Sequence, residues 1–226
     1  MSDSTKNGEL TREFAWGVAH DVSNLMQVIL GFAELLRMQH AEDAELQQCV
    51  EEIITASGRG REMVTQLRLI GRRCEPALEP TDLNALLEGL ATELTALLGP
   101  QIRLAWRLQA GGLRIPLDRA CVGLAVTHLC ACARNAMGGG GTLTIATEQG
   151  HSGVQLTVQD TGAGYEPAAA ARLCEPFFIK RTLGFGHGLE FAVAQGVAEQ
   201  HAGTLTVDTA PGRGTAVRLV FPNAAA

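Results

Sequence analysis

The sequence predicts two domains of different class, an all-α helical hairpin followed by an α+β domain. Two long segments near the N-terminus carry apolar residues at alternating gaps of four and three. That spacing is typical of helices that pack into bundles. Beyond residue 81, short segments with two-residue alternation cluster around a few helical ones, which is the pattern of strands. We therefore expect a disordered N-terminus (1–9), a helical hairpin (10–73), a linker (74–81) and an α+β domain (82–223).

The hairpin is expected to consist of one helix from about Leu10 to His40 and a second from Ala44 to about Arg73. The apolar positions are Phe14, Val18, Leu25, Val28, Phe32 and Leu35 in the first helix, and Cys49, Ile53, Ala56, Gly60, Met63, Leu67 and Ile70 in the second. A single hairpin cannot bury these seams, so we expect two copies to pair into a four-helix bundle. Folding about the joint is expected to place Gly58 and Gly60 opposite His20, where small residues leave room for a docking partner.

The α+β domain is expected to follow a linker that contains two prolines, Pro76 and Pro80. Helical spacing predicts helices over 82–98, 118–137 and 188–201. Alternation predicts strands over 101–108, 141–148, 153–160, 203–210 and 214–221, with the second and third paired and the last two forming a hairpin. The glycines of 138–141 are expected to end the second of these helices.

Charge and composition exclude several classes of function. The net charge of −6 argues against a nucleic-acid surface, which requires clustered Lys and Arg. No apolar run approaches the roughly 20 residues that span a bilayer, and the polar N-terminus has no signal-peptide pattern. The six cysteines form no CxxC pair, so buried thiols in a reducing compartment are the simplest interpretation. We expect a cytoplasmic protein without a transmembrane segment.

A polar trio interrupts the first apolar seam. His20 and Asp21 are adjacent, and Asn24 follows one helical turn later, so imidazole and amide share one side of the helix. A solvated histidine of a bundle is one interpretation. We favour a chemical one, in which the imidazole accepts a phosphoryl group, because neutral imidazole is nucleophilic near neutral pH.

Two glycine motifs lie in the second domain. The first, Asp160-Thr-Gly162-Ala-Gly164, directly follows a predicted strand, where it is either a plain turn or a site at which a carboxylate accepts a hydrogen bond from a ligand amine. The second spans Gly184 to Leu189 and leads into a helix, an arrangement that suits anion binding but also occurs in hinges. Between them lies the segment Glu-Pro-Phe-Phe at 175–178, followed by Lys180.

In this order, the motifs resemble those of the two-component sensor histidine kinases, over nearly the whole chain. The resemblance implies an ATP-binding α/β sandwich of the Bergerat type, shared with gyrase-type and chaperone ATPases. It also implies a set of residues that bind the nucleotide: Asp160, Gly162, Gly164, Phe178, Lys180, Gly184, Gly186, Gly188 and Leu189.

The resemblance further implies the reaction. In this family the histidine attacks the γ-phosphate of ATP, with Mg²⁺ as the metal, and passes the phosphoryl group to an aspartate of a response-regulator receiver. His20 is then the acceptor, Asp21 takes the proton from the other ring nitrogen, and Asn24 holds the acceptor or a hydrolytic water. Almost nothing precedes the hairpin, so the input signal is expected from a separate sensor protein.

The chain departs from the family pattern in the helix before Gly138. His128 and Cys132 stand where asparagines are usual, and Cys132 is at the expected Mg²⁺ position. A thiol suits Mg²⁺ poorly, so the metal ligands are left open, with Asn135 as an offset source of oxygen. Glu190 replaces a small residue and is expected to place a negative charge near the phosphates. His128, Cys130 and Cys132 are expected to be buried packing rather than a soft-metal site.

Three functions remain open from the sequence. The leading one is an autophosphorylating histidine kinase. The second is a histidine phosphotransfer protein with a vestigial ATP domain, which receives its phosphoryl group from one receiver and delivers it to another. The third is a binding module that pairs with a true kinase and regulates it without chemistry.

Overall fold

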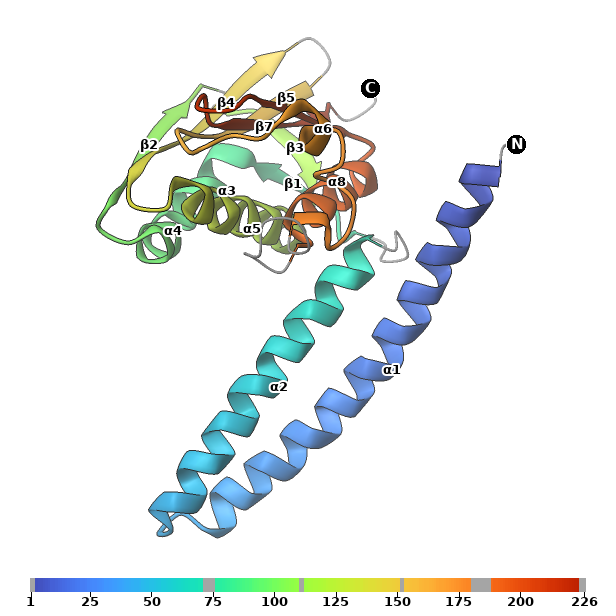
Figure 1. Cartoon of the computed structure of the whole chain (residues 1–226), viewed down its shortest axis with the longest axis vertical. Coiled ribbons are helices and arrows are strands. Elements are labelled where there is room, and N and C mark those ends of the chain that lie inside the picture. Colours follow the sequence, from blue (N-terminus) through green and yellow to red (C-terminus); the bar gives the residue numbers. More distant parts are fainter. Residues whose placement is uncertain (1–2, 71–75, 110–111, 151–152, 180–187, 224–226) are drawn as a thin grey trace. The chain divides into compact units, whose positions relative to one another are not determined.

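A computed structural model divides the chain into two compact units, Met1–Cys74 and Glu75–Ala226. It describes residues 3–70, 76–109, 112–150, 153–179 and 188–223, and in the hairpin it describes the side chains of 21–58, 60 and 64. Figure 1 shows a helical hairpin in the first unit and a sheet with helices in the second. The predicted fold class is confirmed.

The hairpin consists of α1 (Asp3–Gln39) and α2 (Ala44–Ile70). Asp43 caps α2, because its Oδ1 accepts a hydrogen bond from the Leu46 N–H at 3.0 Å. The Gln47 amide donates to the carbonyls of Arg37 and His40, at 3.0 and 2.9 Å, and so fastens the joint. Residues 3–9, expected to be disordered, are helical, because a segment without proline extends an existing helix by one hydrogen bond per residue.

Among the described side chains of the hairpin, the buried ones lie outside the predicted seams, and of the seam only Gly60 is in close contact with the other helix. Val50, Ser57 and Val64 are buried and lie seven residues apart on α2. The seam residues Leu25 and Phe32 are instead 60% and 65% exposed in the single chain. One apolar face of the hairpin is therefore open.

The position expected for the hairpin glycines was wrong. A Cβ at Gly60 would lie 2.8 Å from the Met26 sulfur, so Gly60 faces Met26 rather than His20. Gly60 lets α1 and α2 approach each other closely, whereas a Cβ at Gly58 would meet open space.

The second unit is built on a five-stranded sheet in the order β2-β4-β5-β7-β6. The strands are β2 (Ile102–Leu108), β4 (Gly141–Gly150), β5 (Gly153–Asp160), β6 (Thr204–Thr209) and β7 (Thr215–Pro222). All five predicted strands are present, and both predicted pairings are antiparallel. The sheet is mixed, because β2 pairs with β4 in parallel.

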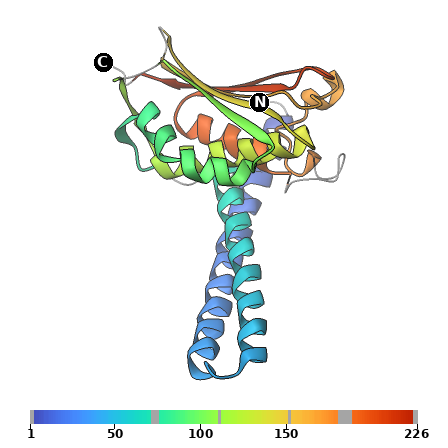
Figure 2. The ribbon, with the colours of Figure 1, turned by 90° about the vertical axis from the view of Figure 1, so that its left-hand side faces the viewer.

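Two long helices, α5 (Arg119–Met137) and α8 (Glu190–Gln200), cover one face of this sheet, as Figure 2 shows. Their buried residues, such as Val126, Leu129 and Val193, form the core with Leu143 and Leu156 of the sheet. Gly138 ends α5 in the left-handed conformation, as expected. A four-residue helix, α6 (Pro167–Ala170), precedes the aromatic segment.

The start of this unit differs from the prediction. A two-stranded antiparallel sheet forms between β1 (Glu79–Asp82) and β3 (Arg114–Leu117), so the expected linker 74–81 is partly a strand. Pro80 opposite Pro116 hid both strands, because proline lacks an N–H for a ladder. The single helix expected over 82–98 is two helices, α3 (Leu83–Gly89) and α4 (Ala91–Leu98), which meet at Leu90.

Among the described residues, α5 alone has the length and apolar composition of a membrane-spanning helix, and 56% of that stretch is buried. The core helix of a folded unit has the same two properties, and α5 packs against the sheet on one side and beside α4 and α8 in the helix layer.

Candidate nucleotide site and phosphoryl acceptor

The trio proposed as the phosphoryl acceptor lies on α1. His20 is within this helix, but its side chain lies outside the described part of the structure. The side chains of Asp21 and Asn24 are exposed. Both are therefore on a surface that a protein partner can reach.

Asp160 is the buried acid at the end of β5. Its side chain is 6% exposed, and its Oδ1 accepts a hydrogen bond from the Gly162 N–H at 2.7 Å. Burial raises the pKa of Asp160, while backbone hydrogen bonds from Gly162 and Thr215 oppose that rise. Because these bonds hold the carboxylate in one orientation, it is a preorganised acceptor for a ligand amine.

The loop after Asp160 is tightly packed against its own protein. A Cβ at Gly162 would collide with the Ala136 carbonyl, and one at Gly164, where φ is 68°, with the Ala210 carbonyl. The Ala163 N–H donates to the carbonyl of Ala136 at 3.2 Å and so joins the loop to α5. These glycines therefore position Asp160 by allowing the loop to pack closely.

A small cavity of about 10 Å³ lies beside Asp160, with room for roughly one water molecule. Tyr165 and Thr215 line it together with Asp160, Cys132 and Phe191. Sequence reasoning missed Tyr165 and Thr215. Tyr165 directly follows the DxGxG motif and so carried a local signal. Thr215 lies on β7, and only the fold brings it to this site.

The aromatic segment holds one phenylalanine inside and one outside. Phe178 is buried, and the Arg172 guanidinium lies 4.5 Å from its ring centre. Arg172 also donates to both carboxylate oxygens of Glu175, at 2.8 to 3.0 Å. Phe177 is 38% exposed with φ 63°, and its N–H donates to the Gly188 carbonyl. The segment is thereby fixed to the start of α8.

Of the second glycine motif, only the end is described. Gly188 has φ 77°, and Leu189 is fully buried at the start of α8. Lys180, Gly184 and Gly186 lie outside the described residues. The roles predicted for them, and for the rest of the nucleotide set, remain predictions.

The α5 residues that differ from the family pattern are buried, as is Cys130 between them. His128, Cys130 and Cys132 are at most 6% exposed, and burial raises the pKa of both thiols to about 12. Cys132 Sγ lies 3.8 Å from the Tyr165 hydroxyl. Among the described residues, no three His, Cys, Asp or Glu side chains form a group that could hold a metal ion. Neutral, buried thiols fit the packing role we expected.

Glu190 lies in the first turn of α8 and is 3% exposed. Its negative charge is among the causes that raise the pKa of Cys132 and of Tyr165. Glu190 is thus close to these two side chains, inside the layer formed by α5 and α8.

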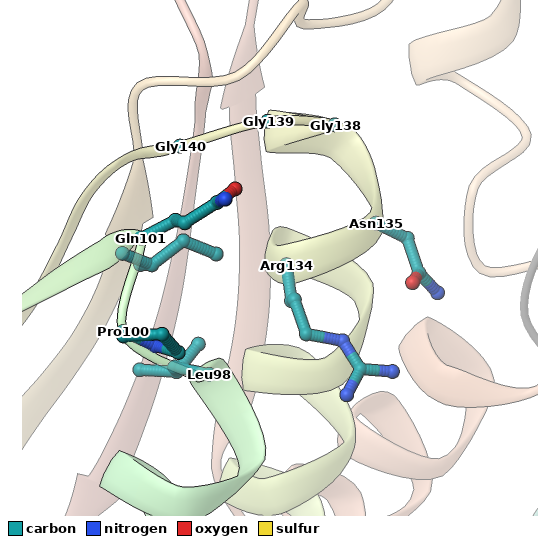
Figure 3. Close-up of a pocket in the computed structure, with 9 residues that line it drawn as sticks. Leu98, Pro100, Gln101, Arg134, Asn135, Gly138, Gly139 and Gly140 are labelled. Atoms are coloured by element: carbon teal, nitrogen blue, oxygen red, sulfur yellow. The ribbon is translucent and has the colours of Figure 1, made fainter.

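A larger pocket of about 450 Å³ lies between the start of β2 and the end of α5 (Figure 3). Pro100, Gln101, Arg134 and the glycines of 138–140 line it. Asn135 is at its edge, with its side chain pointing away from Gln101 and the glycines. Of the predicted nucleotide-binding residues that the structure describes, none lines this pocket.

Whether this unit can bind Mg²⁺ depends on which of its side chains can act as ligands. The protonated Cys132 thiol is not a ligand for a hard ion. The carboxylate of Glu190 and the amide oxygen of Asn135 are chemically suitable. Residues of α5 and α8 thus carry oxygen donors of the kind that Mg²⁺ prefers, although Cys132 itself is unsuitable.

Two family models match the chain. The His Kinase A phospho-acceptor domain matches residues 10–74, and the histidine kinase-, DNA gyrase B- and HSP90-like ATPase matches residues 118–225. The chain belongs to the two-component sensor histidine kinase family. In this histidine kinase chain, the two matched domains follow one another in the order predicted from the motifs.

Individual proteins similar to this chain are also histidine kinases. The chain is 27% identical over 225 residues to the sensor kinase CckA of Brucella abortus, covering 93% of this chain and 24% of CckA. It is 28% identical over 210 residues to the sensor histidine kinase ZraS of Klebsiella oxytoca, covering 92% and 45%. The crystal structure of full-length ShkA in complex with AMPPNP has a TM-score of 0.74 at 23% identity, over 95% of this chain and 47% of ShkA. The chain thus spans less than half the length of these histidine kinases.

Proposed function

We propose that this chain is an ATP-dependent histidine kinase of a two-component phosphorelay. His20 takes the phosphoryl group from ATP and passes it to an aspartate of a response-regulator receiver. The observation that carries this proposal is the presence, in one chain, of a phospho-acceptor domain with an HDxxN motif and an ATPase domain of the same family.

The residues around His20 suit phosphoryl transfer. Neutral imidazole has one ring nitrogen with a free lone pair, which attacks the γ-phosphorus of ATP. A nitrogen–phosphorus bond forms while the bond to the bridging oxygen breaks and releases ADP. Asp21 accepts the proton from the other ring nitrogen, and Asn24 lies one turn away to orient the receiver or a hydrolytic water.

The ATP unit supplies binding and orientation. Asp160 accepts a hydrogen bond from the adenine amine, and the backbone N–H groups at the start of α8 face the phosphates. When bound, Mg²⁺ offsets the charge that develops on the transferred phosphoryl group. Asn135 carries an amide oxygen of the kind that would hold it.

We further propose that the protein is a homodimer through α1 and α2. Leu25, Val28, Phe32 and Leu35 are between 51% and 65% exposed in the single chain, and all four belong to the seam. Contiguous apolar area of this kind marks an interface, and a second copy of the same seam completes a four-helix bundle.

The phosphotransfer and regulatory alternatives are not favoured, because the ATPase model matches the chain from residue 118 to residue 225. The three functions also differ in the expected source of a phosphoryl group on His20: ATP for the kinase, a phosphorylated receiver for the phosphotransfer protein, and none for the regulatory module.

The test compares wild type, His20→Ala and the matched control His40→Ala, which removes an exposed histidine just beyond α1. Each protein is incubated with γ-labelled ATP and Mg²⁺, and separately with a phosphorylated receiver. Acid-labile label from ATP in wild type and His40→Ala, absent in His20→Ala, supports the kinase. Label from the receiver alone supports phosphotransfer, and no label by either route supports the regulatory module.

A further inference from the structure

Three side chains of the segment that follows α6 lie in a row. The Glu175 N–H donates to the Arg172 carbonyl at 2.9 Å, and the Phe178 N–H donates to the Glu175 carbonyl at 3.1 Å. Successive hydrogen bonds over three residues place side chains three apart on the same side of the backbone. The Arg172 guanidinium therefore reaches both the Glu175 carboxylate and the Phe178 ring.

Arg172 makes two contacts at once. Its Nε and Nη2 donate to both oxygens of Glu175, at 2.8 to 3.0 Å, and its guanidinium carbon lies 4.5 Å from the centre of the Phe178 ring. A lysine has a single ammonium group and cannot reproduce this forked geometry. Because an exposed ion pair adds little to the stability of a whole domain, the effect of Arg172 is expected to be local.

The residue next to this cluster has an unfavourable backbone conformation. Phe177 has φ 63°, in the left-handed region, and its N–H donates to the carbonyl of Gly188 at 2.6 Å. Such a conformation persists where the contacts around it fix the backbone. On one side these contacts are those of the buried Phe178 with Arg172, and on the other side the bond to Gly188, which precedes α8.

We propose that Arg172 is a positioning residue for the nucleotide site. By holding Glu175 and Phe178, it keeps Phe177 in the conformation that fixes the Gly188 carbonyl and the start of α8. The inference rests on the proposed function, which assigns the phosphates of ATP to the N–H groups at the start of α8. Arg172 acts through Phe177 and Gly188 rather than on the nucleotide itself.

The first measurement is the ATP affinity of the full chain by titration calorimetry. Arg172→Ala is expected to weaken binding about tenfold, because the segment must then be ordered when ATP binds. Arg172→Lys keeps the charge without the fork and is expected to lie between Arg172→Ala and wild type. The matched control is Arg37→Ala on α1, since Arg37 also pairs with a glutamate three residues away, Glu34, at similar exposure. It is expected to bind ATP as wild type does.

The second measurement is hydrogen exchange followed by mass spectrometry without nucleotide. In Arg172→Ala, peptides that cover 173–179 are expected to exchange faster, while peptides over 154–159 of β5 and the thermal unfolding midpoint stay close to wild type. A merely structural role would lower the midpoint and speed exchange in the sheet as well. This measurement requires neither ATP nor His20.

Several results overturn the proposal. Unchanged ATP affinity in Arg172→Ala does so, as does unchanged exchange over 173–179. Wild-type affinity in Arg172→Lys would mean that charge alone suffices, which contradicts the role given to the forked guanidinium. Weaker binding together with a lower midpoint and faster exchange in β5 would make Arg172 a structural residue only. A wild-type chain that binds no ATP refutes the proposed function itself, and this inference with it, whatever the exchange shows.

Discussion

His201 ties the end of α8 to the start of α5. Its Nε2 accepts a hydrogen bond from the Asp118 N–H at 2.9 Å, so Nδ1 carries the proton and donates to the Val197 carbonyl at 2.7 Å. The ring also lies edge-on to Phe221, with centres 5.5 Å apart. The buried His201 side chain thus connects α8 to the start of α5 and packs against the Phe221 ring on β7.

We expect His201→Ala to lower the free energy of unfolding by about 2–4 kcal/mol, because the Asp118 N–H loses its partner and the ring contact is lost. Urea unfolding followed by fluorescence measures the change. The exposed His40 is the control, and His40→Ala is expected to change stability by less than about 0.5 kcal/mol. Equal effects of the two substitutions would contradict the role given to His201.

Asp160 gives a prediction on nucleotide binding. Asp160→Asn is expected to weaken ATP binding roughly 10- to 100-fold, since a hydrogen bond to a charged acceptor is lost. Burial raises the pKa of Asp160 above 3.8. Protonation replaces the acceptor with a hydroxyl, so wild-type affinity should fall as pH is lowered, beginning above the usual carboxyl range.

Titration calorimetry over a pH series that runs from neutral pH down into the usual carboxyl range measures this effect. Asp208→Asn is the control, because the Asp208 side chain is 74% exposed and lies on β6. A pH profile that persists unchanged in Asp160→Asn would show that another group titrates.

At the scale of elements, the packing of α1 on α2 depends on one close approach. Gly60 faces the Met26 sulfur, while Gly58 faces open space on the same helix. Two glycines of one helix therefore have different reasons to be present, and the difference is measurable.

Gly58→Ala is expected to stabilise the hairpin by about 0.5–1 kcal/mol, because alanine favours a helix over glycine. Gly60→Ala is expected to gain less or to destabilise, since Met26 must move to admit the new methyl group. Thermal unfolding followed by far-ultraviolet circular dichroism compares the two variants. The close packing at Met26 is refuted if both gain equally.

At the scale of the whole molecule, the open apolar face of the hairpin predicts self-association. Leu25→Glu and Phe32→Glu introduce charge on this face, where both side chains are at least 60% exposed in one chain. Each is expected to convert a dimer into a monomer while helical content is kept. Charged side chains in the core of a bundle interface are costly to desolvate.

Sedimentation equilibrium measures the mass of each variant. Gln27→Glu adds a charge at an exposed position outside the seam and is expected to leave the dimer intact. A wild-type protein that is monomeric at micromolar concentration would refute the proposed dimer.

The sequence predicted most helices and strands, because their signals are local. The alternation over 141–148 and 153–160 and the glycines after Met137 were sufficient to place β4, β5 and the end of α5. It failed at β1 and β3, where prolines conceal two short strands that pair only because distant parts of the chain meet. It also failed at Leu90, since helical periodicity continues through the break between α3 and α4.

For the candidate site, the motifs indicated Asp160 and the glycines around it, because a run of five residues carries that signal. They did not indicate Tyr165 as a buried neighbour of Cys132, nor Thr215 as part of the same cavity. Contacts between α5, α8 and β7 depend on how the layers pack, and single segments do not encode them.

By itself, the sequence determined the order of the domains, the family and the HDxxN motif, since each rests on residues close together along the chain. Only the tertiary structure decided that Val50, Ser57 and Val64 are buried in the hairpin, and that Gly60 packs against Met26. It also packed α5 against α8, although these helices are far apart in sequence. The physical reason is that periodicity gives each helix an apolar face, whereas packing in three dimensions selects what that face meets.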